Sequence, residues 1–273
     1  MSHSKSIAIV LPDLRGGGAE RVSLNLAQYF LKMNYKVYFI LMLPRGEFLS
    51  KVPIEIEVID LSVHRLRQVP FAFSRAIKHL NLDAIIVNMW PLTFVCAIGR
   101  LFSSFKGVLL TVDHNTLSQA ELYKGKGVVR RYLMRFSLKL THRLVDVSVG
   151  VSTGVVKDIA DLSWENSSRF HVAYNPVIMK GKTAHKEIEE NTFWPRSNVK
   201  KILNIGSLTP QKNQALLIKA FSILKKDVDA FLIILGAGDM HDELLSLAKD
   251  EGVEDSILML GFVSDPSLYY QTA

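Results

Sequence analysis

Three glycine-containing loops of this chain follow apolar runs and precede stretches with helical periodicity. The first contains Gly16-Gly17-Gly18, the second runs over 206–212, and the third is Gly236-Ala237-Gly238. Glycine lets a backbone approach a ligand closely, and a helix N-terminus adds free N–H groups and the positive end of a dipole. These loops predict sites for a phosphate or another oxyanion, although a tight strand–helix turn explains the first loop equally well. None of them matches G-x-G-x-x-G or G-x-x-x-x-G-K-[S/T].

Two ionisable side chains accompany the loops. Lys212 stands at the start of an expected helix, where a positive charge opposes the helix dipole unless an anion binds beside it. A solvated lysine is the alternative. His114, in Asp113-His114-Asn115, follows an apolar run and could face a ligand or cap the end of a strand. Ser152 opens another expected helix and fits the role of N-cap.

The elements that position these residues alternate in type. Apolar runs predict strands over 6–11, 36–42, 54–59, 83–88, 107–113, 143–149, 170–174, 200–205, 230–235 and 256–260. Amphipathic stretches predict helices over 18–33, 70–80, 91–103, 126–141, 152–161, 213–226, 239–251 and 265–271. Near-continuous Val, Ile and Leu are typical of strands covered on both faces, and this alternation predicts parallel, doubly wound sheets.

The alternation of predicted strands and helices is interrupted once. Residues 179–199 are polar and lose periodicity, so we expect a linker there between a Rossmann-like domain, 1–178, and a second Rossmann-like unit, 200–273. The second unit has three expected strands, and open α/β sheets usually have more. We therefore expect the second domain to be incomplete.

Composition and charge narrow the class of protein. Hydrophobic residues make up 48% of the 273 residues, which is a globular mixture. Residues 1–180 hold 23 Lys and Arg against 13 Asp and Glu, whereas the remainder holds 10 against 13, so the first part suits an anionic partner. A single cysteine, Cys96, predicts a buried thiol in a reducing compartment. We expect a cytosolic protein or one bound to the cytosolic face of a membrane.

The loops in their order resemble a known family. PDLRGGGAERVSLNLAQYF (12–30), VAYNPV (172–177), ILNIGSLTPQKNQALLIKAFSIL (202–224) and LIILGAGDMHDELLSLAKDEGVEDSILMLGFVSD (232–265) resemble family-4 retaining glycosyltransferases with the two-domain GT-B fold. The resemblance implies transfer of a sugar from a nucleotide-diphosphate sugar, with retained configuration and without a cofactor or metal ion. The acceptor would be a glycan or a lipid-linked molecule, as in surface polysaccharide or glycoconjugate synthesis.

The resemblance also assigns roles to residues. His114 matches the histidine that faces the donor sugar and is the expected catalytic residue, and Lys212 matches the lysine that contacts the diphosphate. The expected donor-binding residues are Gly17, Gly18, Gly206, Ser207, Lys212, Gly236 and Gly238. Many members carry arginine where this chain has Ser207, so one cationic contact is missing. The family pattern E-x7-E follows the stretch that here ends at 273, so we expect a truncated member that lacks part of its donor site and that could be inactive.

Residues 124–143 form a separate feature. This segment holds seven Lys and Arg, no acid and several apolar residues, which is typical of a helix that lies on an anionic membrane. A packed helix with a solvated face is the alternative. Two other functional classes remain open: a nucleotide-sugar epimerase on the same fold, and a non-catalytic basic module that binds nucleic acid or membrane. No nucleic-acid motif is present, so we expect no nucleic-acid partner. Residues 62–75 and 113–126 are expected to border the acceptor.

Overall fold

The computed structural model describes residues 5–119, 127–176, 194–195, 199–263 and 265–273. The chain divides into two compact units, residues 1–179 and 180–273. Most of the predicted linker, 179–199, lies outside the described residues, so its boundaries stay predictions.

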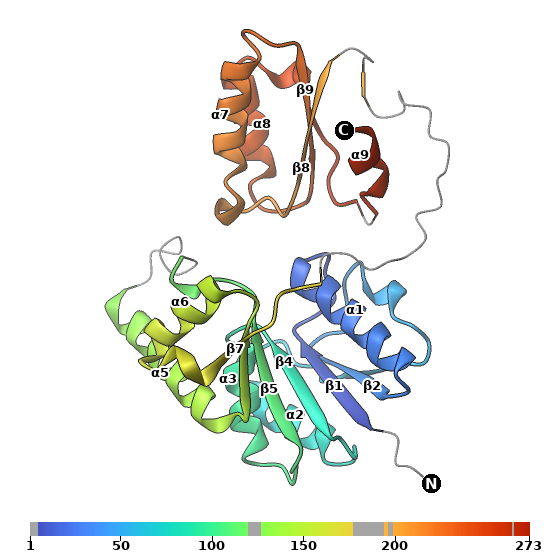
Figure 1. The fold of residues 1–273 in the computed structure, drawn as a ribbon, viewed down its shortest axis with the longest axis vertical. Helices are drawn as coiled ribbons and strands as arrows, with labels where there is room; N and C mark the ends of the chain where they lie inside the picture. Colours follow the sequence, from blue (N-terminus) through green and yellow to red (C-terminus); the bar gives the residue numbers. More distant parts are fainter. Residues whose placement is uncertain (1–4, 120–126, 177–193, 196–198, 264) are drawn as a thin grey trace. The chain divides into compact units, whose positions relative to one another are not determined.

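The first unit contains a seven-stranded parallel sheet in the order β3-β2-β1-β4-β5-β6-β7 (Figure 1). Its strands are β1 (Ser6–Leu11), β2 (Lys36–Leu41), β3 (Glu57–Asp60), β4 (Ala84–Asn88), β5 (Val108–Asp113), β6 (Val147–Gly150) and β7 (Phe170–Val172). Its described helices are α1 (Gly18–Lys32), α2 (Val69–Ile77), α3 (Leu92–Arg100), α5 (Val128–Leu144) and α6 (Thr153–Ser163). The predicted doubly wound α/β fold is confirmed.

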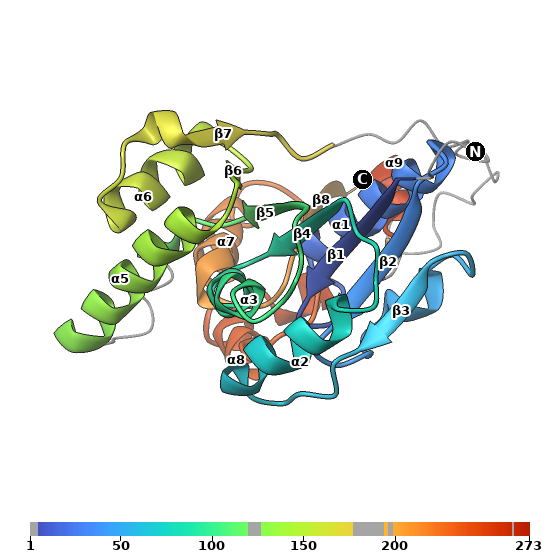
Figure 2. The same cartoon turned by 90° about the horizontal axis from the view of Figure 1, so that it is seen from below.

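Both faces of this sheet are covered. Ala8 and Val10 of β1 face the core that α2 and α3 complete with Phe73 and Cys96 (Figure 2). Since successive strand residues point to opposite faces, the buried Ile9 belongs to the other face, where α1 lies against β1 and β2. All six residues of β1 are therefore buried, which explains its unbroken apolar sequence.

The second unit contains a three-stranded parallel sheet in the order β10-β9-β8. Its elements are β8 (Lys200–Ile205), α7 (Gln214–Leu224), β9 (Ala230–Leu235), α8 (His241–Asp250), β10 (Ile257–Met259) and α9 (Ser267–Thr272). Helices α7 and α8 cover one face of the sheet. Trp194 and Tyr269 cover the other face, and the Trp194 indole N–H donates to the Thr272 hydroxyl at 3.0 Å.

Two predicted strand starts were wrong by three residues or more. The strand predicted over 143–149 begins at Val147, because α5 continues to Leu144. The strand predicted over 54–59 begins at Glu57, since Ile54 is fully exposed and lies in a turn.

Candidate functional site

The first unit carries its candidate residues at the carboxyl end of the sheet. The strand order reverses between β1 and β4, and ligands of doubly wound sheets bind at such a switch point. Gly17 and Gly18 follow β1 at this point, with Gly17 as the N-cap of α1, and His114 follows β5. The structure thus places these three residues along one edge of the sheet.

Carboxylates already pair with the first glycine loop. The Gly16 N–H donates to a Glu47 carboxylate oxygen at 2.9 Å, and the Glu20 carboxylate lies against Gly17. Burial is the main cause that raises the pKa of Glu20, with the nearby charge of Asp13 adding to it. A phosphate here would meet these carboxylates, whereas a hydroxyl could donate to them. The carboxylates beside the loop therefore favour a ligand that presents hydroxyl groups, although Arg15 is close enough to Glu20 and Glu47 to offset part of their charge.

His114 is held by Asn88, which ends β4. The Asn88 amide nitrogen donates to the Val10 carbonyl at 3.3 Å, so its oxygen faces His114, whose Nε2 lies 3.0 Å away. An amide oxygen only accepts, so Nε2 carries the proton and Nδ1 is the unprotonated nitrogen. Nδ1 is buried and has no partner among the described residues. Burial lowers the pKa of His114 to about 4, so the ring is neutral at pH 7.

Asp113 precedes His114 and is also buried. Burial raises its pKa to about 7, and a hydrogen bond from the Trp90 backbone opposes that rise. The Trp90 indole N–H donates to Ser137 of α5 at 3.0 Å. Asp113 and Asn88 were missed from the sequence. A polar residue at the end of a buried strand was the signal that could have found both of them.

In the second unit, the two remaining glycine loops pack against each other. Gly236 has φ +152°, and a Cβ atom there would lie 1.9 Å from the Gly206 carbonyl oxygen. A Cβ atom on Gly238 would lie 2.3 Å from the Leu208 carbonyl oxygen. Backbone hydrogen bonds join the loops, including Leu208 N–H to Ala237 O at 3.0 Å. Close backbone packing therefore accounts for Gly236 and Gly238 even without a ligand.

Lys212 lies beside this pair of loops. Its side-chain stem passes 3.7 Å from the position of a Cβ on Gly206, and the residue is exposed. No acid among the described residues lies within ion-pair distance of its ammonium group. Helix α7 begins two residues later without a side-chain cap. Lys212, without an acidic partner in the described part of the chain, and the N–H groups at the start of α7 together suit a phosphate. The carbonyl of Ser207 accepts the Gln214 amide at 3.1 Å.

Helix α5 exposes apolar residues among its cations. Val128 and Leu133 are 81% and 60% exposed, and Val129, Tyr132 and Phe136 are exposed as well. Arg130, Arg131, Arg135, Lys139 and Arg143 belong to the same helix, which contains no acid. The packed face consists of Met134, Ser137, Leu138, Thr141 and His142. We call the exposed residues Val128–Leu133 and Phe136 the α5 surface. Residues 124–126 of the predicted basic segment lie outside the described residues.

Membrane-spanning helices and metal-binding clusters are both absent from the ranges that the structure describes. No helix there is long and apolar enough to cross a bilayer. No group of three or more His, Cys, Asp or Glu side chains there is arranged to hold a metal ion. The expectation of a metal-free reaction stays a prediction.

The chain matches known sequence families along most of its length. Residues 16–179 match the family described as Glycosyltransferase Family 4, and residues 186–273 match the family described as Glycosyl transferases group 1. One relative is N-acetylgalactosamine-N,N'-diacetylbacillosaminyl-diphospho-undecaprenol 4-alpha-N-acetylgalactosaminyltransferase of Campylobacter jejuni. It is 25% identical over 275 residues, which cover 97% of this chain and 72% of that protein.

Solved structures share the fold. HepE from Anabaena, solved in complex with UDP and glucose, has a TM-score of 0.74 at 17% identity over 98% of this chain and 72% of that one. WaaG, a glycosyltransferase involved in lipopolysaccharide biosynthesis, has a TM-score of 0.73 at 14% identity over 98% of this chain and 73% of that one. With a family match over 16–179 and this GT-B architecture, the chain belongs to glycosyltransferase family 4 and is a glycosyltransferase of group 1.

Proposed function

We propose that this glycosyltransferase moves a sugar from a nucleotide-diphosphate sugar to a glycan or lipid-linked acceptor, with retention of configuration, in surface polysaccharide or glycoconjugate synthesis. The observation that carries the proposal is Lys212, which has no acidic partner among the described residues and lies beside the packed glycine loops and the start of α7, where no side chain caps the helix. The relative from Campylobacter jejuni is named for a diphospho-undecaprenol substrate, and HepE was solved with UDP and glucose. Both names support a donor and acceptor of these classes.

In this proposal Lys212 contacts the donor diphosphate. Its charge offsets negative charge that develops on the departing nucleoside diphosphate, and the N–H groups at the start of α7 add to that stabilisation. Gly206 and Ser207 bring the loop backbone close to the same phosphates. Gly236 and Gly238 hold the neighbouring loop in place through the close packing described above.

His114, Gly17 and Gly18 are proposed to face the donor sugar. The neutral imidazole of His114 cannot supply a proton from a cationic form at pH 7. Its unprotonated Nδ1 is the nitrogen left to accept a hydrogen bond from a sugar hydroxyl. The carboxylates of Glu20 and Glu47 beside the glycine loop can accept hydrogen bonds from sugar hydroxyls.

Nucleoside diphosphate binding tests the proposal. A panel of nucleoside diphosphates is titrated against the chain, against Lys212→Ala, and against Lys219→Ala as a matched exposed lysine on α7. We expect one diphosphate to bind and Lys212→Ala to weaken it about tenfold or more, because a charge-assisted hydrogen bond contributes about 1.5–3 kcal/mol. Lys219→Ala should leave binding unchanged. The proposal fails if no diphosphate binds or if both variants behave alike.

We also propose that the protein works at the cytosolic face of a membrane, docked through the α5 surface. Apolar side chains can enter the headgroup region while each nearby Lys or Arg adds about 1 kcal/mol of attraction to anionic lipid. Sedimentation with vesicles of anionic phospholipid at low salt is the test. Val129→Ser with Leu133→Ser should reduce the bound fraction, whereas Leu216→Ser with Ile223→Ser, an exposed apolar pair on α7, should not. Equal loss in both double variants would contradict the docking.

A further inference from the structure

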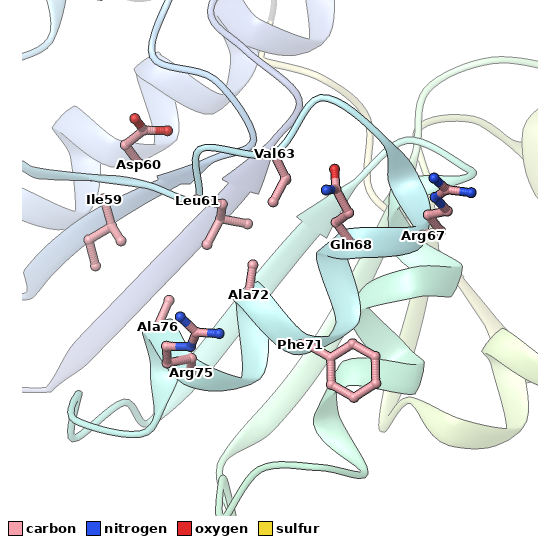
Figure 3. A pocket seen from close by; sticks show the side chains of 10 residues that line it. All are labelled: Ile59, Asp60, Leu61, Val63, Arg67, Gln68, Phe71, Ala72, Arg75 and Ala76. Atoms are coloured by element: carbon pink, nitrogen blue, oxygen red, sulfur yellow. The ribbon is translucent and has the colours of Figure 1, made fainter.

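A hollow of about 710 Å³ opens between the edge strand β3 and helix α2 in the first unit (Figure 3). Its apolar lining comes from Ile59, Leu61 and Val63 on the strand side and from Ala72 and Ala76 on the helix side. The two alanines are four residues apart, so they lie on one face of α2. Their small side chains leave the space open where larger residues would fill it. The volume lies within the range of ligand pockets, about 300–1,000 Å³.

Two arginines border this hollow, which we call the arginine groove. Arg67 and Arg75 are eight residues apart and lie on opposite sides of Ala72 (Figure 3). Both residues are exposed, and neither has an acidic partner within ion-pair distance in the part of the chain that the structure describes. The rim therefore offers two free guanidinium groups beside an apolar floor.

The acidic side chain that lines the groove, Asp60, already accepts hydrogen bonds from its own loop. One Asp60 carboxylate oxygen accepts the Ser62 backbone N–H at 2.7 Å, and the other accepts the Ser62 hydroxyl at 2.7 Å. Asp60 is thus held by its own loop and is not paired with either arginine. The charged residues of the lining leave an excess of one positive charge, so an anion is the complementary ligand.

An aromatic edge extends the apolar floor outward. Phe71 lines the groove, is 63% exposed, and stacks on Phe102, with ring centroids 5.4 Å apart. Phe102 and its neighbour Leu101 are also exposed. Contiguous exposed apolar side chains of this kind mark a surface that a ligand or partner covers.

These features together select one class of ligand. A free phosphate would leave the apolar floor uncovered, and a neutral lipid would leave the guanidinium groups without an anion. We propose that the arginine groove binds an anionic amphiphile, with its hydrocarbon chain on the floor formed by Leu61, Val63 and Ala72 and its phosphate on Arg67 or Arg75. This inference rests on the proposed lipid-linked acceptor, whose phosphate and first chain segment it would place here.

Calorimetric titration of the full chain tests this inference with soluble probes. The probes are octyl phosphate, octyl glucoside, which has the same chain without a charge, and inorganic phosphate, each kept below any micelle concentration. Four proteins are compared: the wild type, Arg67→Gln/Arg75→Gln, Ala72→Leu/Ala76→Leu, and Lys219→Gln/Lys249→Gln as a pair of exposed cations on α7 and α8. Circular dichroism verifies that each variant is folded.

We expect octyl phosphate to bind the wild type more tightly than either other probe. The Arg67→Gln/Arg75→Gln variant should bind it about tenfold or more weakly, because charge-assisted hydrogen bonds are lost, and Ala72→Leu/Ala76→Leu should abolish binding by filling the floor. The Lys219→Gln/Lys249→Gln variant should bind it as the wild type does. The inference is overturned if octyl glucoside or inorganic phosphate binds equally well, if octyl phosphate does not bind, or if the groove variants leave binding unchanged.

A nucleoside diphosphate titration on the same samples separates the two proposals. If diphosphate binding fails while octyl phosphate binding depends on the groove, the proposed sugar transfer is wrong and the groove inference stands. If the diphosphate binds to all four proteins but octyl phosphate binds to none, the groove inference is wrong and the sugar-transfer proposal stands.

Discussion

Replacing Gly236 by alanine should destabilise the second unit strongly. The glycine has φ +152°, and an added Cβ would lie 1.9 Å from the Gly206 carbonyl oxygen, which is backbone and cannot turn aside. The two loops must therefore separate. That movement breaks the hydrogen bond from Gly236 N–H to Gly261 O, 2.7 Å long, and weakens the bond from Leu208 N–H to Ala237 O.

The size of the effect follows from these contacts. A non-glycine residue held in such a backbone region costs about 1–3 kcal/mol, and each of two backbone hydrogen bonds contributes about 1 kcal/mol. The expected loss in the free energy of unfolding is about 3–5 kcal/mol. Since about 1.4 kcal/mol is a tenfold change in an equilibrium constant, the opening of β9 should become more frequent by a factor of about 100 to 4,000.

Amide hydrogen exchange measures this loss locally. Peptides that cover β9 should lose protection in Gly236→Ala, whereas peptides that cover β1 of the first unit should not change. Gly18→Ala is the control, because a Cβ there meets nothing within 4 Å and the residue opens helix α1. That variant should stay within about 1 kcal/mol of the wild type. If Gly236→Ala also stayed within about 0.5 kcal/mol, the argument from backbone packing would be refuted.

Three further outcomes are expected. The folded chain keeps the Asp113 proton up to a pKa of about 7, whereas the unfolded chain releases it near 3.8. The free energy of unfolding should therefore fall as the pH rises from about 3.8 to about 7. Urea titrations of Asp113→Asn at several pH values should lack this part of the pH dependence. Ser152→Ala removes the acceptor of the Val155 N–H, 3.2 Å away, and should cost about 1 kcal/mol in thermal melts, whereas Ser152→Asp should keep the cap; equal losses in both would contradict the capping role. Burial raises the pKa of Cys96, so a thiol reagent should modify it only in denaturant, and rapid labelling of the native chain would refute this.

The fold was predictable because its strongest determinants are local in sequence. Strands β1 and β9 have the bounds that their apolar runs predict, since burial on both faces leaves little room for polar residues. Strand β8 also has its predicted bounds, although its residues are exposed or half-buried. The local sequence pattern did not predict the boundary between α5 and β6. Leu144 and Val145 suit either a helix end or a strand start, and their packing against the α2–α3 core decides the boundary.

The candidate site was less predictable because its properties depend on residues distant in sequence. The sequence predicted Gly236 as a ligand-binding residue. In the fold its backbone packs against Gly206, and this contact alone requires a glycine. Glu47 pairs with Gly16 across 31 positions, so no local pattern could show a carboxylate at the first loop. The orientation of His114 likewise depends on Asn88, which belongs to another strand. The predicted roles of these residues stay predictions.

The position of Trp194 bears on how the second unit assembles during synthesis. Its indole is bonded to Thr272, 78 positions later in the chain, and Tyr269 completes the same apolar layer. Translation must therefore reach α9 before this side of the sheet can exclude water. Until then, an emerging chain would present Ile233 and Leu235 to the cell. Exposed strands of this kind attract chaperones and favour aggregation, so a ribosome pausing between the two segments would prolong the vulnerable interval.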